Sequence, residues 1–157
     1  MQKKKVNVWT LVICLLIVYA AAFLGSLFTS SAVDSSWYEA IKPALTPPNW
    51  VFPVVWNVLF FWIGLSLYFS WTASKNKIIK KKVAFAFGLN LALNVLWSVL
   101  YFGLQKPLYA FIEIWLLELS IAYLIYTAYK IDKMAGWLLV PYLTWVSFAI
   151  ILNGMSL

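Results

Sequence analysis

Residues 43–56 read PALTPPNWVFPVVW, and they mark the point at which a stiff loop becomes a long apolar segment. Each proline lacks a backbone N–H donor and fixes its own φ angle, so a helix cannot run through Pro43, Pro47 and Pro48. From residue 51 to residue 72 the chain carries no charge. We therefore expect a rigid loop that ends where a buried or membrane-spanning helix begins.

The composition of the whole chain points to a membrane protein. Of the 157 residues, 64% are hydrophobic and only 11% are charged, whereas a soluble domain has about 25% charged residues. Histidine is absent and Cys14 is the single cysteine. This excludes disulfides within the chain, cysteine-based zinc sites and histidine-based catalysis or haem ligation, and we expect no metal site.

Five apolar runs follow one another along the chain, and each is long enough to span a bilayer. They cover residues 8–29, 51–72, 83–104, 108–129 and 134–157. A spanning helix needs about 20 residues, and backbone groups in lipid must bond internally, so each run should be helical. The first run is longer than the roughly 7–15 apolar residues of a signal peptide, so we expect it to remain in the mature protein. The sequence thus predicts an all-α integral membrane protein, a single five-transmembrane-helix bundle over 1–157.

The lysines set the expected orientation, because cytoplasmic loops are enriched in positive charge. One side of the membrane would hold Lys3, Lys4, Lys5, Lys75, Lys77, Lys80, Lys81, Lys82, Lys130 and Lys133, and the other only Lys42 and Lys106. This places the N-terminus in the cytoplasm and the C-terminus outside. The 75–82 cluster is either this topology signal or a site for anionic lipid. Because the lysines lie in short clusters between apolar runs, the net charge of +7 does not indicate nucleic-acid binding.

The long outer loop, residues 30–50, is expected to cover one end of the bundle. Residues 35–42 can form a short interfacial helix capped by Asp34 or a serine, with aromatic side chains at headgroup depth. The prolines that follow stiffen the rest of the loop. We assign it as a lid, with Trp37, Pro47 and Trp50 as the candidate lid residues.

The third span shows two differently specialised faces at about 100° per residue. One face holds Asn90, Asn94, Trp97 and Tyr101. Amide groups need partners away from water, so this face should look into the bundle, either as structural hydrogen-bonding groups or as part of a site. The opposite face holds Ala84, Gly88 and Ala92. Such small residues permit close helix approach, either within the chain or across a dimer interface.

Two carboxylates interrupt the fourth span. Glu113 shares a stripe with Tyr109 and could accept its hydroxyl proton, whereas Glu118 lies nearly opposite with no evident partner in the sequence. A charge at mid-helix costs about 2.5–3.5 kcal/mol on insertion scales. Each glutamate is therefore either protonated and bonded to a neighbouring helix or part of a proton relay.

Aromatic residues gather in the outer half of the predicted bundle. The inward group comprises Trp56, Trp97, Tyr101, Tyr109, Tyr142 and Trp145. Other tryptophans, such as Trp9 and Trp71, are typical of membrane-interface belts. Flat aromatic walls with a few polar groups suit a large, planar, mostly apolar ligand. In the fifth span Pro141 should kink the helix and free a carbonyl.

The order of these motifs resembles the translocator protein family, also known as the tryptophan-rich sensory protein or peripheral benzodiazepine receptor family. The resemblance is carried by Pro43 with Thr46-Pro47-Pro48, Trp50-Val51-Phe52-Pro53 with Trp56, Ala92-Leu93-Asn94 with Trp97, and Pro141-Tyr142-Leu143 with Trp145. It covers nearly the whole chain in the right helix order. The resemblance implies a single domain of this type, usually a homodimer, with a cavity that opens toward the first loop.

The resemblance also implies a ligand and a set of ligand-binding residues. The ligand would be a porphyrin such as protoporphyrin IX, or a synthetic isoquinoline or benzodiazepine, with no resident cofactor. By position, the family site would comprise Trp56, Asn94, Trp97, Tyr109, Trp145, Ala149 and Leu152, and the inward stripes add Glu113 and Tyr142. Tyr109 and Leu45 stand where relatives carry tryptophan. The cholesterol motif of animal members has no match at residues 153–157, so we do not expect cholesterol binding.

Three functions remain open on the sequence alone. The first is porphyrin binding for transport, sensing or tetrapyrrole homeostasis. The second is light- and oxygen-dependent porphyrin degradation, for which Trp56 and Trp145 are the candidate catalytic residues. The third is a structural or regulatory role beside other membrane proteins. Short loops, the lack of a cleavable segment and lysine-only basicity favour a multi-pass protein of a bacterial cytoplasmic membrane.

Overall fold

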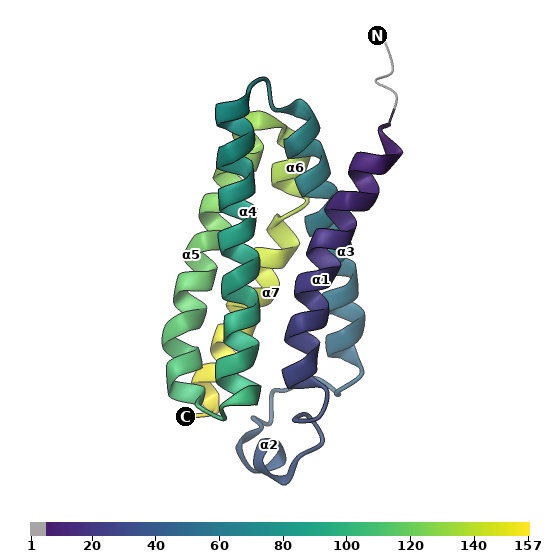
Figure 1. Ribbon diagram of the computed structural model, residues 1–157. Coiled ribbons are helices and arrows are strands. Elements are labelled where there is room, and N and C mark those ends of the chain that lie inside the picture. Colours follow the sequence, from purple (N-terminus) through teal and green to yellow (C-terminus); the bar gives the residue numbers. More distant parts are fainter. Residues whose placement is uncertain (1–5) are drawn as a thin grey trace.

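The computed structural model describes residues 6–157, which form helices and contain no strand; the connections are short except for the loop at 30–50. Five helical segments are long and apolar enough to cross a membrane: Val8–Thr29, Val51–Ala73, Lys77–Gly103, Pro107–Ile131 and Lys133–Met155. They run side by side as an up-and-down bundle (Figure 1). The predicted five-helix membrane bundle is confirmed.

Helix α1 (Val8–Thr29) has the predicted bounds, and α3 (Val51–Ala73) and α5 (Pro107–Ile131) differ from prediction by a few residues. Helix α4 (Lys77–Ser98) begins well before residue 83, where the apolar run begins. The Asn76 side chain caps it by accepting a hydrogen bond from Ile79 N at 2.9 Å. Since lysine is a good helix former, the helix extends through the basic segment beyond its apolar part.

The end of α4 is wider than an α-helix. Residues Val99–Gly103 form a π-helical turn, η1, in which Leu104 N donates to Val99 O at 2.7 Å. This turn buries the adjacent rings of Tyr101 and Phe102 together, with centroids 4.8 Å apart. Such π-turns recur at functional sites, and the 100° periodicity used for sequence analysis does not detect them.

The fifth span is broken rather than simply kinked. It consists of α6 (Lys133–Trp137) and α7 (Val140–Met155), and Pro141 stands in the first turn of α7. Proline cannot donate to the preceding turn, so the helix restarts there. The break lets α6 pack on α5 and α3 while α7 continues along α5 toward the opposite end of the bundle.

We expect Gly136→Ala to destabilise this packing by about 1–3 kcal/mol, the usual effect of overpacking. A Cβ at Gly136 would lie 2.6 Å from Tyr129 Cβ and 2.9 Å from Tyr129 Cα, so backbone would have to move. Unfolding in mixed micelles, followed by circular dichroism, measures the loss. The matched control is Gly88→Ala, because a Cβ at Gly88 has nothing within 4 Å. Equal stability of both variants would contradict the prediction.

The bundle has two distinct ends. Helix α1 packs on α3 and α4, and α5 packs on α4 and α7. The α3–α4 and α5–α6 connections, with the lysines at 75–82, 130 and 133, lie at one end together with the start of α1 (Figure 1). Lys3, Lys4 and Lys5 lie outside the described residues, and the orientation in the membrane stays a prediction.

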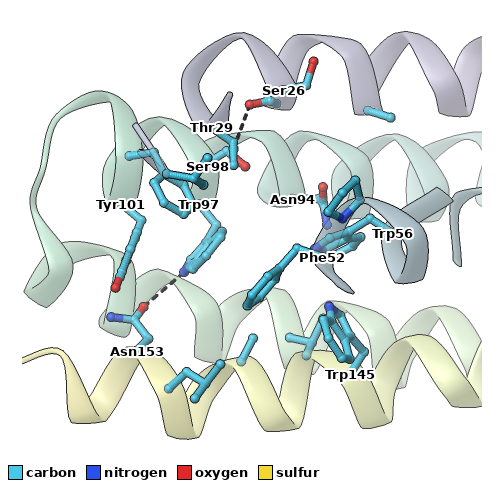
Figure 2. A pocket seen from close by; sticks show the side chains of 18 of the residues that line it. Ser26, Thr29, Phe52, Trp56, Asn94, Trp97, Ser98, Tyr101, Trp145 and Asn153 are labelled. Atoms are coloured by element: carbon cyan, nitrogen blue, oxygen red, sulfur yellow. Dashed lines mark hydrogen bonds between the residues drawn. The ribbon is translucent and has the colours of Figure 1, made fainter. Parts of the chain in front are cut away.

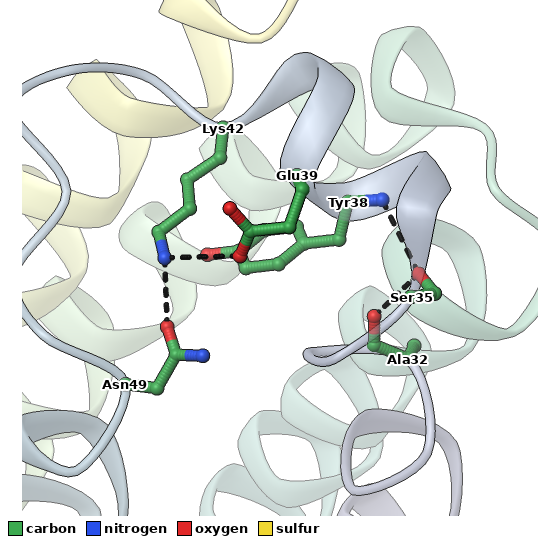
Figure 3. A network of polar contacts seen from close by, with 6 residues as sticks. All are labelled: Ala32, Ser35, Tyr38, Glu39, Lys42 and Asn49. Atoms are coloured by element: carbon green, nitrogen blue, oxygen red, sulfur yellow. Dashed lines mark hydrogen bonds and ion pairs between the residues drawn. The ribbon is translucent and has the colours of Figure 1, made fainter.

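The opposite end is covered by the loop that contains α2 (Ser36–Ile41). Its cap is Ser35, one of the predicted capping residues: the hydroxyl accepts from Tyr38 N at 3.2 Å and donates to Ala32 O at 2.6 Å. Lys42 Nζ donates to Glu39 Oε1 at 3.3 Å and to Asn49 Oδ1 at 2.9 Å, which ties α2 to the proline-rich segment (Figure 3).

Candidate ligand-binding cavity

A cavity of about 550 Å³ lies inside the bundle at the end that the loop covers. Helices α1, α3, α4, α5 and α7 and the loop around α2 all contribute to its walls. Ligand sites for small molecules are typically about 300–1,000 Å³ and mostly apolar with a few polar groups. This cavity has that size and that character.

The tryptophans in the cavity walls come from three helices, α3, α4 and α7 (Figure 2). Trp56 stacks on Phe60 with centroids 5.2 Å apart and planes at 28°. Phe52 meets Trp145 edge-on at 5.8 Å, which links α3 to α7 across the cavity. The walls are therefore rigid flat surfaces, and their ring faces can stack on a planar ligand.

Trp97 and Tyr101 form a second aromatic pair, nearer the lid, with centroids 5.1 Å apart and planes at 20°. Trp97 Nε1 donates to Asn153 Oδ1 at 3.1 Å, and the Tyr101 hydroxyl donates to Ser156 Oγ at 2.8 Å. These bonds fix both rings against α7. Asn153 Nδ2 also donates to Pro107 O at 3.0 Å, which joins α4, α5 and α7 at one point.

Two polar side chains of the cavity wall have distinct roles. Asn94 Nδ2 donates to the Tyr142 hydroxyl at 3.1 Å, so the amide is held in a defined orientation where it meets the cavity. Thr46 Oγ1, from the loop, is buried and has no hydrogen-bond partner among residues 6–157. An unpartnered hydroxyl in a cavity wall is available to a polar group of a ligand.

Helix α1 contributes a face that the sequence analysis missed. Tyr19, Ala22, Ser26 and Thr29 all line the cavity. Their spacing of three and four residues is the signal that could have found them. It is weak because α1 is apolar all round and its serine and threonine hydroxyls bond to the helix's own carbonyls, for example Thr29 Oγ1 to Gly25 O at 3.2 Å.

The loop meets the cavity through residues other than the predicted ones. Tyr38, Pro43, Thr46 and Asn49 line it, whereas the predicted lid residues do not. Trp37 instead packs edge-on against Tyr101 at 5.9 Å, Pro47 is half-buried, and Trp50 is 68% exposed at the start of α3. The loop is held against η1 by Trp37 and Tyr38, while Pro43, Thr46 and Asn49 face the cavity.

Tyr38 is the main anchor of the loop. Its ring is buried, 5.5 Å from the Phe102 ring, and lies beneath the Lys42 ammonium at 5.6 Å. Burial, with smaller contributions from Tyr101 and Glu39, raises the pKa of Tyr38 to about 12. The phenol is therefore neutral at physiological pH, and the docking of the loop does not depend on its ionisation.

The structure brings together most of the predicted ligand-binding residues. Those that line the cavity are Trp56, Asn94, Trp97, Trp145, Ala149 and Leu152. Glu113 and Tyr142 are buried behind the wall and do not line it. Tyr109 is 60% exposed and faces away from the bundle, with no hydrogen bond to Glu113. The helical periodicity of 100° per residue predicts which residues share a helix face. It does not predict which neighbouring helix packs against each of those residues.

The small-residue face of α4 has no partner within the described chain. Ala84, Gly88 and Ala92 are all exposed on the outside of the bundle, and Gly88 has open space where a Cβ would be. Of the two possibilities that the sequence left open, packing of this face within the chain is therefore not observed in residues 6–157. The part of the chain described here also holds no group of three or more histidine, cysteine or acidic residues that could bind a metal.

The fold and the cavity define a polytopic α-helical membrane protein with an aromatic-lined internal site. Residues 12–156 match the TspO/MBR family, and the chain belongs to that family. It is 41% identical over 148 residues to the tryptophan-rich protein TspO of Archaeoglobus fulgidus, with 94% of each chain covered. It is 31% identical to the tryptophan-rich sensory protein of Cereibacter sphaeroides, covering 84% of this chain and 83% of the relative. It is also 31% identical to the translocator protein of Homo sapiens, covering 83% and 78%.

Proposed function

We propose that this protein binds a large, planar, mostly apolar molecule of the porphyrin type, with protoporphyrin IX as the first ligand to test. The observation that carries the proposal is the cavity of about 550 Å³ with Trp56, Trp97 and Trp145 in its walls. Rings that face a cavity rather than lipid provide stacking surface for a flat ligand. The names of two relatives, a tryptophan-rich sensory protein and a translocator protein, support sensing and transport as the uses of such binding to propose.

The cavity residues are expected to make different kinds of contact with the ligand. Trp56 and Trp145 present flat surfaces, and the half-buried Ala149 and buried Leu152 complete the apolar wall of α7. The Asn94 amide and the unpartnered Thr46 hydroxyl can meet the polar edge of the ligand. The loop around α2 forms the wall at one end of the cavity through Tyr38, Pro43, Thr46 and Asn49, so a bound ligand would contact it.

A titration of the purified protein with protoporphyrin IX, followed by absorbance and tryptophan fluorescence, tests this proposal. We expect saturable binding in the dark and quenching of tryptophan emission, because indoles line the site. The same mixture is then illuminated in air. Intact porphyrin under light supports binding alone, whereas a defined product formed over many turnovers and absent in Trp145→Phe would identify degradation. Lack of saturable binding in the dark would refute the proposal.

We further propose that the protein acts as a homodimer in a bacterial cytoplasmic membrane, with the exposed small-residue face of α4 as the contact. We expect Ala92→Leu to shift the reconstituted protein toward monomer, because a larger side chain prevents close helix approach. Mass photometry or cross-linking in nanodiscs measures the shift. Ala122→Leu, at an exposed position of α5, is the matched control. An unchanged dimer in Ala92→Leu would place the contact elsewhere.

A further inference from the structure

Polar side chains meet between α4, α5 and α7 in the middle of the bundle, behind the cavity wall. We call this set the interhelical polar cluster. It comprises Asn90, Asn94, Glu113, Glu118, Ser120, Tyr142 and Ser147. All seven lie within membrane-spanning segments. Ionisable groups at such depth are costly and call for a functional explanation.

Hydrogen bonds connect the three helices through this cluster. Asn90 Nδ2 donates to Ser120 Oγ at 2.9 Å, which joins α4 to α5. Asn94 Nδ2 donates to the Tyr142 hydroxyl at 3.1 Å, which joins α4 to α7. The cluster therefore ties α4 to both α5 and α7, and Asn94 is its member in the cavity wall.

Ser147 contacts Glu118, but its single hydroxyl proton lies between two acceptor oxygens. Its hydroxyl lies 2.5 Å from Glu118 Oε1 and 2.9 Å from Leu143 O. A serine hydroxyl carries one proton and cannot donate to both acceptors.

Four other oxygen atoms of the cluster also lack a hydrogen-bond donor among residues 6–157. Asn90 Oδ1, both carboxyl oxygens of Glu113 and Glu118 Oε2 are buried without a hydrogen-bond partner in the described chain. Asn90 is fully buried and Glu113 is only 4% exposed. Buried polar atoms are normally paired, and unpaired ones point to an unobserved partner. Here every unpaired atom is an acceptor, so the missing partner must be a donor or a cation.

No basic residue within 6–157 supplies that partner. The only ion pair among residues 6–157 joins Lys42 to Glu39 in the loop. The lysines nearest along the chain are Lys106, about 10 Å from Glu113 along the α5 axis, and Lys130, about 18 Å from Glu118 along the same axis. The members of the cluster on the neighbouring helices are uncharged: the two asparagines of α4, and Tyr142 and Ser147 of α7, of which Ser147 contacts Glu118. A proton is the smallest species that meets the acceptor excess.

We propose that the interhelical polar cluster is a proton-binding site within the membrane, with Glu113 as the exchangeable carboxyl, and that a ligand in the adjoining cavity changes its proton occupancy. The second half rests on the proposed function, whereas the first does not. The reaction is the protonation of one carboxylate by a proton that comes from water.

The coupling runs through Asn94 and Tyr142. A ligand oxygen at the cavity wall competes for Asn94 Nδ2, which then no longer donates to the Tyr142 hydroxyl. The hydroxyl is free to reorient toward the carboxyls. A porphyrin also brings its own carboxylates into a poorly solvated cavity, where an ionised Glu113 would repel them. Ligand binding should therefore be accompanied by proton uptake.

Infrared difference spectroscopy of the ligand-free protein tests the site itself. We expect a carbonyl band of a protonated carboxyl that shifts in D₂O, fades as the pH is raised, and is missing in Glu113→Gln but present in Glu118→Gln. The pH series on the wild-type protein still tests for a protonated carboxyl even if a variant does not fold. A Glu113 that is ionised at every pH overturns the proposal. So does a band that appears or vanishes when choline is replaced by sodium at constant pH, since sodium would then be the bound cation.

Calorimetry with protoporphyrin IX, in buffers of different ionisation heat, tests the coupling at the pH where the infrared band is half its maximum. We expect net proton uptake, and binding that weakens by up to about tenfold per pH unit above it. Glu113→Gln should bind porphyrin without uptake, and Tyr142→Phe should show reduced uptake. Tyr68→Phe is the control, because the Tyr68 hydroxyl accepts from Asn7 N at 3.1 Å, far along α3 from the cavity.

The two assays separate the possible failures. Unchanged proton uptake in Glu113→Gln overturns the coupling even if porphyrin binds. If wild-type protein binds no porphyrin, the proposed function fails, and the infrared pH series still decides whether Glu113 holds an exchangeable proton.

Discussion

Replacement of Trp145 by alanine is expected to weaken protoporphyrin IX binding by about 30-fold or more, which corresponds to about 2 kcal/mol. The indole lies in the cavity wall, 5.8 Å from the Phe52 ring. It also lines an outward-facing groove of about 610 Å³ between α3 and α7. Truncation would thus remove stacking area and open the cavity toward lipid. Tryptophan in an enclosed site is among the residues with the largest effects on affinity.

Trp115→Ala is the matched control for this experiment. Trp115 is 51% exposed on α5, packs on Phe111 with centroids 6.3 Å apart, and does not line the cavity. Its removal should leave the dissociation constant within about twofold of wild type. Equal weakening in both variants would show that binding occurs on the outer surface or that tryptophan loss acts through stability. Trp145→Phe should retain part of the affinity, because a ring remains in the wall.

The largest effect on stability is expected from Asn153→Leu, which has a similar side-chain volume. Asn153 is 1% exposed and bonds both Trp97 Nε1 and Pro107 O. The leucine would leave a buried donor and a buried acceptor unpaired, at about 1–3 kcal/mol each. We expect a lower free energy of unfolding in mixed micelles. The Trp97 ring, no longer fixed by α7, should also show altered fluorescence.

Asn57→Leu provides the comparison for the stability measurement. Asn57 Nδ2 donates to Pro53 O at 2.8 Å within its own helix, and the residue is exposed. Loss of that local bond should change stability by less than about 1 kcal/mol. If Asn153→Leu is as stable as Asn57→Leu, the bonds that join α4, α5 and α7 contribute little to the fold.

The inward face of α4 is a feature that the residue pattern predicts correctly. The stripe of Asn90, Asn94, Trp97 and Tyr101 was predicted to face the interior, and all four are buried or half-buried there. Amides are strongly disfavoured against lipid, so their direction follows from chemistry alone. Tyr109 behaves differently because a tyrosine tolerates a lipid or interfacial position. Its direction depends on how α5 is rotated against α4 and α7.

Contacts between distant segments could not be predicted in the same way. The partner of Glu118 is Ser147, 29 residues further along the chain. The loop is anchored on η1 by Trp37 and Tyr38, whereas the sequence pattern of the loop emphasised its prolines. Such pairings depend on the break before α7 and on the π-helical turn of η1. Neither feature changes the apolar pattern of the spans.

The sequence by itself determined the number of spans, their approximate bounds, the stiff loop between the first two and the aromatic composition of one end. These follow from local physics, because every backbone group in lipid must bond within its own helix and every run must match the membrane thickness. The tertiary structure decided which faces enclose the cavity, which side chains line it and which carboxyls are left without partners. Those properties depend on helix rotation and helix breaks, since lipid is as apolar as the helix surfaces and only packing and hydrogen bonds between helices select their relative rotation.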